Sequence, residues 1–278
     1  MTAPRRLPAA LALVSVVTLV VYLPVLTSLV RQWASDDNYS HGFIVAPFAV
    51  YLGWRRRHEL AAQPLRPRGA GLAIVLASLA LLVAGRLGAE LFLTRVSLLG
   101  LMAGTVVFLL GMGHLRLLAF PLAFLLLMIP LPAVVFNQIA FPLQLLASSA
   151  GQSVLDAASI PVLREGNILI LPTITLQVVE ACSGIRSLVS LLTLAIIIGA
   201  LTEQRLWARL LLAALAFPVA IAANAARVAG TGLMAAWIGP QAAQGFLHEF
   251  SGWVVFVAAF AMLLATRRAF PKPQVRTA

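Results

Sequence analysis

Three polar side chains at the ends of apolar segments could together carry out covalent chemistry. Cys182 is the only cysteine of the chain, Arg227 follows a long apolar run, and His248 precedes another. A cysteine thiolate is a nucleophile, a histidine moves protons near neutral pH, and a fixed cation stabilises a developing oxyanion. Together these residue types supply what covalent acyl transfer requires.

The residues around Cys182 favour a reactive thiol. Cys182 lies where a strand pattern meets an apolar helix pattern, and the positive end of a helix dipole lowers the pKa of a thiol. Arg186 follows four residues later, on the same helical face, and adds positive charge. Glu180 and Ser183 could support the site, and Ser183 is a weaker alternative nucleophile. A buried, unreactive cysteine is the competing interpretation.

Arg227 and His248 are predicted to lie at the same membrane face as Cys182. Arg227 lies 22 residues after Arg205, which is about 33 Å of helix and close to one bilayer core. Its small neighbours, and Asn224 one turn earlier, indicate a side chain that faces protein. The alternatives are an arginine that extends to the interface and a histidine that caps a helix.

The loop before the second apolar segment holds further polar side chains. Asp37 and His41 could face a substrate there, or they could form an ordinary polar loop with a helix cap. No His-Glu-x-x-His zinc motif is present, because His248 and Glu249 are followed by Phe-Ser-Gly. One cysteine and four scattered histidines also disfavour a structural metal site. We therefore expect no metal and no cofactor.

The composition identifies the elements that must position these residues. The 278 residues are 61% hydrophobic and only 10% charged, whereas a soluble domain carries about 25% charged residues. Several apolar runs approach the roughly 20 residues that a membrane helix needs. We therefore expect an all-α polytopic membrane protein, with a single integral membrane domain over residues 1–278 and a basic cytoplasmic tail over 267–278.

About eight membrane spans are predicted from the apolar runs. They cover residues 9–30, 41–54, 70–88, 96–113, 115–132, 183–201, 206–228 and 250–266. With this topology one face carries 14 Lys or Arg and two Glu, and the other carries six Arg and seven acids. Because positive loops stay in the cytoplasm, both termini are predicted to be cytoplasmic. The net charge of +11 thus reports topology, not nucleic-acid binding.

Residues 133–182 are predicted to lie on the extracytoplasmic side. Their first part, 134–158, has polar residues mostly on one helical side, which indicates an interfacial amphipathic helix. Gly166-Asn167 between two apolar stretches predicts a β-hairpin, and the alternating residues up to Val178 predict a further strand. This small β element leads directly into the segment of Cys182.

These motifs resemble those of one membrane family. The cysteine motif of the exosortases, relatives of the archaeosortases, is similar to Val179-Glu180-Ala181-Cys182-Ser183-Gly184-Ile185-Arg186-Ser187. Their arginine motif resembles Asn224-x-x-Arg227, and their histidine resembles His248. Their N-terminal signature looks like Asp37-x-Tyr39-Ser40-His41-Gly42. The resemblance covers nearly all of residues 9–266.

The resemblance implies a multispanning cysteine protease-transpeptidase. Cys182 would be the nucleophile, His248 the general acid/base and Arg227 the stabiliser of the oxyanion. The implied substrates are membrane-anchored exported proteins with a C-terminal PEP-CTERM-type sorting signal: a Pro-Glu-Pro motif, a transmembrane helix and a basic cluster. The enzyme would work at the outer face of a bacterial inner membrane and would pass its thioester to an unknown acceptor nucleophile. Its expected partners are these substrates and the lipid bilayer, not nucleic acid.

Two other classes of function stay open at this point. A non-proteolytic membrane transporter could use Arg227 and Asp37 to line its pathway. A polysaccharide or lipid assembly protein is the third class. Both differ from the enzyme in one respect, because neither needs the thiol of Cys182.

Overall fold

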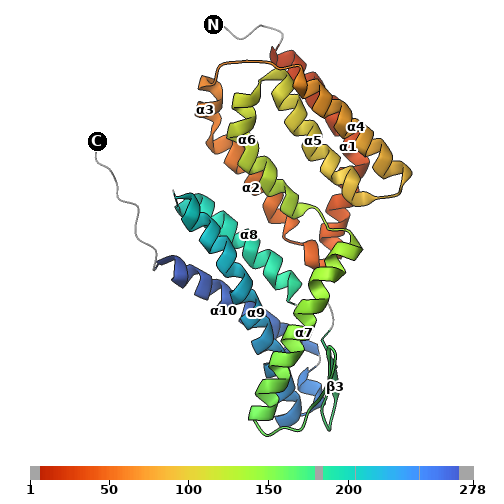
Figure 1. The fold of residues 1–278 in the computed structure, drawn as a ribbon, viewed down its shortest axis with the longest axis vertical. Coiled ribbons are helices and arrows are strands. Elements are labelled where there is room, and N and C mark those ends of the chain that lie inside the picture. The colour runs from red at the N-terminus through yellow and green to blue at the C-terminus, as the bar shows by residue number, and fades with distance from the viewer. Residues whose placement is uncertain (1–6, 179–183, 204, 244, 269–278) are drawn as a thin grey trace. The chain divides into compact units, whose positions relative to one another are not determined.

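The computed structural model describes residues 7–178, 184–203, 205–243 and 245–268. Within these ranges the side chains of residues 7, 242–249 and 251 lie outside the described part. The chain divides into two compact units, Met1–Pro132 and Ala133–Ala278, and each is described by itself (Figure 1). The prediction of a single membrane domain stays a prediction.

The first unit is helical in every described element. Its elements are α1 (Leu7–Ser35), η1 (Asp37–Tyr39), α2 (Gly42–Arg55), α3 (Arg57–Ala62), α4 (Ala70–Leu87), α5 (Leu91–Leu109), α6 (Met112–Phe124) and η2 (Leu125–Met128). Pro130 and Pro132 follow η2. Because proline cannot continue a helix, the helical segment ends before the predicted limit of 132.

Small residues let α4 and α5 approach closely. Gly71, Ser78 and Gly85 recur every seven residues on α4, and all three are buried. A methyl group added at Gly85 would lie 2.8 Å from Cγ2 of Thr94, and one added at Gly104 would lie 2.8 Å from the backbone nitrogen of Val75. Without a hydrophobic driving force between helices in lipid, such close backbone packing is what holds a helix pair together.

Polar side chains connect α1 to α5 inside this unit. The hydroxyl groups of Tyr22 and Ser97 lie 3.0 Å apart, and Ser97 also donates to the carbonyl of Thr94 at 2.7 Å. Arg95 donates from Nη2 to the hydroxyl of Ser28 at 3.3 Å. Satisfied polar groups of this kind add directional contacts between helices that hydrocarbon side chains alone do not supply.

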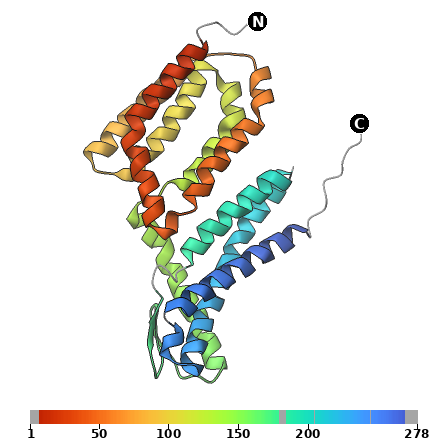
Figure 2. The ribbon, with the colours of Figure 1, turned by 180° about the vertical axis from the view of Figure 1, so that it is seen from behind.

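The second unit combines four long helices with a small sheet. Its elements are α7 (Ala133–Ala157), β1 (Leu163–Glu165), β2 (Ile168–Ile170), β3 (Thr175–Gln177), α8 (Ile185–Thr202), α9 (Leu206–Trp237), η4 (Pro240–Ala243) and α10 (Gly245–Arg268). Both views show α8, α9 and α10 side by side (Figures 1 and 2). Leu191, Ala216 and Leu263, one from each helix, are fully buried in their shared core.

The predicted hairpin and the following strand are confirmed as an antiparallel sheet with the order β1-β2-β3. Glu165 pairs with Ile168, so the connection is the two-residue turn Gly166-Asn167, and Gly166 has a φ of 64°. Glycine adopts this left-handed conformation without a steric cost. The inner face of the sheet packs on α7 and α9 through Leu155, Leu169 and Val228.

The polar side of α7 faces this sheet. Ser148 is fully buried and donates to the carbonyl of Gly166 at 3.0 Å. Gln144 accepts from the side-chain amide of Asn167 at 3.1 Å, and Gln152 accepts from Arg164 at 3.0 Å. The amphipathic pattern over 134–158 therefore reflects hydrogen bonds to the hairpin. The interfacial position of this helix stays a prediction.

The structure confirms an all-α polytopic membrane protein with a small β element. Within the described residues, six helices are long and apolar enough to cross a membrane: Pro8–Ser35, Ala70–Leu87, Leu91–Leu109, Ala133–Ala157, Ile185–Thr202 and Leu206–Trp237. The predicted spans 41–54, 115–132 and 250–266 are also largely helical, as α2, α6 with η2, and α10. Helix α7 was not predicted to cross, although its 25 residues are long enough.

Candidate functional site

The cysteine motif leads into α8 through a left-handed backbone position. Gly184 is the N-cap of α8 and has a φ of 77°, in the left-handed region. A methyl group added there would lie 2.8 Å from Cβ and 2.8 Å from Cγ of Asn224 on α9. Only glycine fits both the conformation and the space. The structure therefore brings the glycine of the cysteine motif against the first residue of the Asn224-x-x-Arg227 motif.

The second polar residue of that motif meets α10. A methyl group added at Gly252 would lie 2.9 Å from Cζ, 3.0 Å from Nη2 and 3.1 Å from Nε of Arg227. The guanidinium group thus lies against the backbone of α10. Gly252 follows His248 by four residues, which is about one helical turn. The motif on α9 therefore contacts both the start of α8 and the turn of α10 that follows His248.

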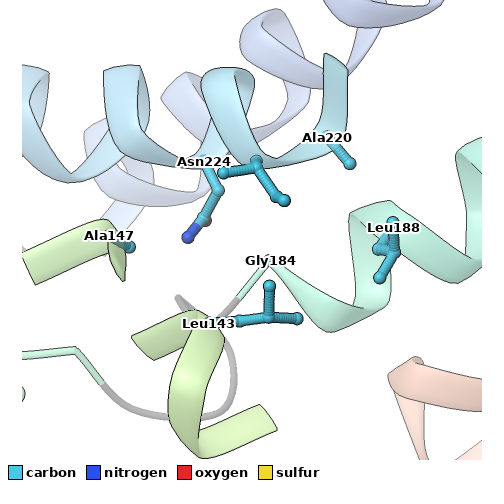
Figure 3. A pocket seen from close by; sticks show the side chains of 7 residues that line it. Leu143, Ala147, Gly184, Leu188, Ala220 and Asn224 are labelled. Atoms are coloured by element: carbon cyan, nitrogen blue, oxygen red, sulfur yellow. The ribbon is translucent and has the colours of Figure 1, made fainter. Parts of the chain in front are cut away.

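A small pocket opens beside Asn224. Its lining comes from α7, α8 and α9 and consists of Leu143, Ala147, Gly184, Leu188, Ala220, Ile221 and Asn224. Figure 3 shows the amide of Asn224 directed into this space beside Gly184. The cavity volume is about 10 Å³, close to the smallest space that holds one water molecule. The buried amide of Asn224 is thus the polar group in an otherwise apolar lining.

Not every predicted site residue can be placed. Glu180, Cys182 and Ser183 lie outside the described residues, and so does the side chain of His248. Arg186 lies in the first turn of α8 and is half-buried. Helix α8 begins three residues after Cys182 in the sequence, and the position of the thiol at the helix start stays a prediction.

Asp37 and His41 belong to the first unit. Asp37 lies in η1, and the side chain of the preceding Asp36 caps it by accepting from the backbone N–H of Asn38 at 3.0 Å. His41 is 5% exposed, and its Nε2 donates to the carbonyl of Leu127 at 2.8 Å. This contact supports the interpretation of a capped polar loop, in which His41 connects the start of α2 to η2.

Gly42 in the same loop has a packing reason. A methyl group added at Gly42 would clash with the indole ring of Trp33. The indole N–H of Trp33 donates to the carbonyl of Met128 at 2.9 Å. Trp33 and His41 therefore both hold η2 against the loop, and Gly42 leaves the space that Trp33 needs.

The burial of Arg95 was not predicted from the sequence. Arg95 precedes the predicted span 96–113 by one residue, and its side chain is only 3% exposed. The described part of the chain contains no ion pair between Arg95 and a carboxylate. Intramembrane arginines are rare and usually functional. The only signal of this burial in the sequence is a charged residue beside a long apolar run. That signal does not distinguish charges that lie inside the protein from charges that lie at its surface.

A second unpredicted cluster joins the other ends of α8, α9 and α10. Glu203 is 6% exposed, and its Oε1 lies 3.2 Å from Nε of Arg267. Its backbone carbonyl accepts from Nε of Arg209 at 2.8 Å. All three charges lie in segments predicted to be cytoplasmic, and no local pattern in the sequence indicates that they pair.

The arrangement supports polar chemistry next to a small apolar pocket. Among the described residues, no group of three or more His, Cys, Asp or Glu could hold a metal ion. The groups that the geometry gathers are an amide, a guanidinium and the start of a helix. All three can donate hydrogen bonds or positive potential to an anionic oxygen.

Comparison with known proteins identifies one family. The family model of the transmembrane exosortases matches residues 33–265. The matched range is most of the chain, and it includes every predicted site residue from Asp37 to His248. The searches of curated proteins and of solved structures found no match.

Proposed function

The chain belongs to the transmembrane exosortase family, and from this premise we propose that it is a cysteine protease-transpeptidase acting on sorting signals. Family membership makes it a multi-pass membrane sorting enzyme. The finer proposal is cleavage of C-terminal PEP-CTERM-type signals of exported proteins. Cys182 is the proposed nucleophile, His248 the general acid/base and Arg227 the oxyanion stabiliser.

The proposed reaction has two halves. The thiolate of Cys182 attacks the scissile carbonyl carbon, a C–S bond forms, and the carbonyl oxygen becomes an anion beside Arg227. His248 gives a proton to the departing amine as the C–N bond breaks, which leaves a thioester. His248 then takes a proton from an acceptor nucleophile. That nucleophile attacks the thioester, the C–S bond breaks, and the thiolate of Cys182 is restored.

One observation carries this proposal: the chain segments that bear the cysteine and histidine motifs both meet α9, which bears the arginine motif. Gly184 contacts Asn224, and Gly252 contacts Arg227, within a single turn of that helix. A guanidinium group held against a backbone loses little further freedom when an oxyanion forms, so its stabilising effect is preorganised. Asn224, which is 5% exposed, is proposed to position the segment that leads from Cys182 into α8.

The proposal includes the membrane and the partners. We place the protein in a bacterial inner membrane because the family resemblance implies it, and the charge distribution supports both termini in the cytoplasm and the site on the extracytoplasmic side. A substrate helix with the same inside-positive orientation presents its signal at that outer face. The proposed partners are these membrane-anchored substrates, an acceptor nucleophile and the lipid bilayer.

Substitution of the nucleophile tests the proposal. Cys182→Ala should abolish processing of a matched sorting-signal substrate in cells, while the adjacent Ser183→Ala serves as the matched control and should retain processing. Normal processing by Cys182→Ala would end the proposal and favour the transporter or assembly alternatives. Loss with Ser183→Ala alone would instead identify the serine as the nucleophile.

Mass spectrometry tests the covalent step directly. When the purified protein is mixed with a sorting-signal peptide, the protein should gain the mass of the acyl fragment. The added mass should lie on the fragment of the protein that contains Cys182. Hydroxylamine should remove this mass, because thioesters are cleaved by strong nucleophiles. An adduct on any other residue, or turnover without an adduct in the rapid-quench time range, would contradict the thioester mechanism.

A further inference from the structure

The outer edge of β3 has backbone groups that face away from the sheet. The sheet order β1-β2-β3 places β3 at one end. The N–H of Val178 donates to the carbonyl of Asn167 at 2.9 Å, and the N–H of Leu171 donates to the carbonyl of Ile174 at 2.9 Å. The even-numbered residues from 174 to 178 thus direct their backbone groups toward β2.

Thr175 and Gln177 have the opposite orientation. Backbone N–H and C=O groups alternate from side to side along a strand, so those of Thr175 and Gln177 point outward from β3. Both residues are exposed, whereas Leu176 between them packs toward the core. No described segment pairs with this edge, and α7 contacts β1 and β2 instead. Two N–H and two C=O groups are therefore directed outward.

An unpaired strand edge is a template for an extended chain. Proteins recognise extended peptides by adding them to such an edge through main-chain hydrogen bonds. The edge of β3 can offer four of these bonds. Its last residue, Gln177, lies five residues before Cys182, so the intervening chain spans at most about 17 Å. A peptide added here is thus held within one short segment of the proposed nucleophile.

We infer that the edge of β3 binds the substrate as an added β-strand, with Thr175 and Gln177 supplying the main-chain hydrogen bonds. This inference rests on the proposed function, because it takes a peptide as the substrate. The occupant is an extended segment next to the scissile bond. Because the hydrogen bonds come from the backbone, the site recognises the extended conformation of the peptide and tolerates different side chains at the paired positions.

Proline substitution tests the protein side of this contact. Thr175→Pro removes one outward N–H at the first residue of the strand, where proline is tolerated, and Thr175→Ala is the matched control that keeps it. Binding of a fluorescent sorting-signal peptide is measured by anisotropy with protein that also carries Cys182→Ala. One lost hydrogen bond should weaken binding by the Thr175→Pro variant about 2- to 12-fold relative to the Thr175→Ala variant, which keeps the N–H.

N-methylation tests the peptide side and needs no change at β3. Methyl groups are placed on one backbone nitrogen at a time, and binding should weaken at every second residue because only alternate N–H groups face the edge. Uniform tolerance, losses without this period, or no binding of the unmodified peptide would overturn the inference. Self-association of the protein that Thr175→Pro abolishes would assign the edge to a second copy of the chain instead.

These outcomes are separate from the test of Cys182. The binding assay uses protein without the thiol, so it reports on the edge even if no cleavage occurs. Conversely, cleavage that depends on Cys182 while binding is insensitive to Thr175→Pro and to N-methylation would retain the proposed function and reject the strand-addition site.

Discussion

Gly184→Ala should damage both the fold and the site, and the size of the effect can be worked from the structure. Two costs act at this position. An L-residue in the left-handed conformation costs roughly 1–2 kcal/mol, and Gly184 has a φ of 77°. The new methyl group would also meet Cβ and Cγ of Asn224 at 2.8 Å, and such overpacking costs about 1–3 kcal/mol. We expect the free energy of unfolding to fall by about 2–5 kcal/mol.

A matched control separates the two costs. Gly166 also has a positive φ, 64°, but a methyl group there meets nothing within 4 Å. Gly166→Ala should therefore show only the conformational cost of about 1–2 kcal/mol. The measurement is denaturant unfolding of the purified protein in detergent, followed by tryptophan fluorescence. The energetic cost of the contact with Asn224 is the difference between the free energies of unfolding of the two variants.

The refuting result is equal destabilisation of Gly184→Ala and Gly166→Ala, which would mean that Gly184 does not lie against Asn224. A double variant gives an independent check. Asn224→Ala removes Cγ and the amide that crowd position 184, so part of the contact cost should be recovered when it is combined with Gly184→Ala. Processing of a sorting-signal substrate should fall with Gly184→Ala and be retained with Gly166→Ala.

Two further substitutions test buried charges. Glu203→Gln breaks the pair with Arg267 and should lower the free energy of unfolding by about 1–3 kcal/mol. This is less than for a fully buried pair, because Arg267 is 31% exposed. The control Glu59→Gln changes an exposed residue and should have no effect, so equal unfolding midpoints for the two variants would contradict the pairing. Arg95→Met replaces a buried guanidinium that has no carboxylate partner in the described part, so the unfolding midpoint should be unchanged or higher. A lower midpoint than that of Arg164→Met, which loses bonds to Gln152 and Gly166, would show that Arg95 stabilises the fold.

The fold was predictable where the sequence repeats a simple pattern. Long apolar runs predicted the helices, and Gly166-Asn167 between apolar stretches predicted the hairpin turn at its observed position. Alternation from residue 173 to 178 predicted β3. Each of these signals is local, because it depends on the period of one segment and on the conformational freedom of glycine.

Tertiary pairing was not predictable from those local signals. The polar residues of α7 have the same spacing whether they face lipid headgroups or the hairpin, and only the structure shows Ser148 bonded to Gly166. Arg95 and Arg86 look alike in the sequence, yet Arg95 is buried and Arg86 is exposed. A single sequence shows which groups are costly to bury, but it does not show which partner offsets that cost with a hydrogen bond or an ion pair.

The candidate site shows why a short polar motif can have a fixed spacing. Residues three apart on an α-helix are about 60° apart around its axis, so Asn224 and Arg227 share one side of α9 but point toward different neighbours. Asn224 meets Gly184 before α8, and Arg227 meets Gly252 on α10. In each case a glycine permits the polar group to approach the backbone. Moving the arginine by one position would rotate it by about 100°, away from the contact with α10, so the spacing itself holds the guanidinium beside the turn that follows His248.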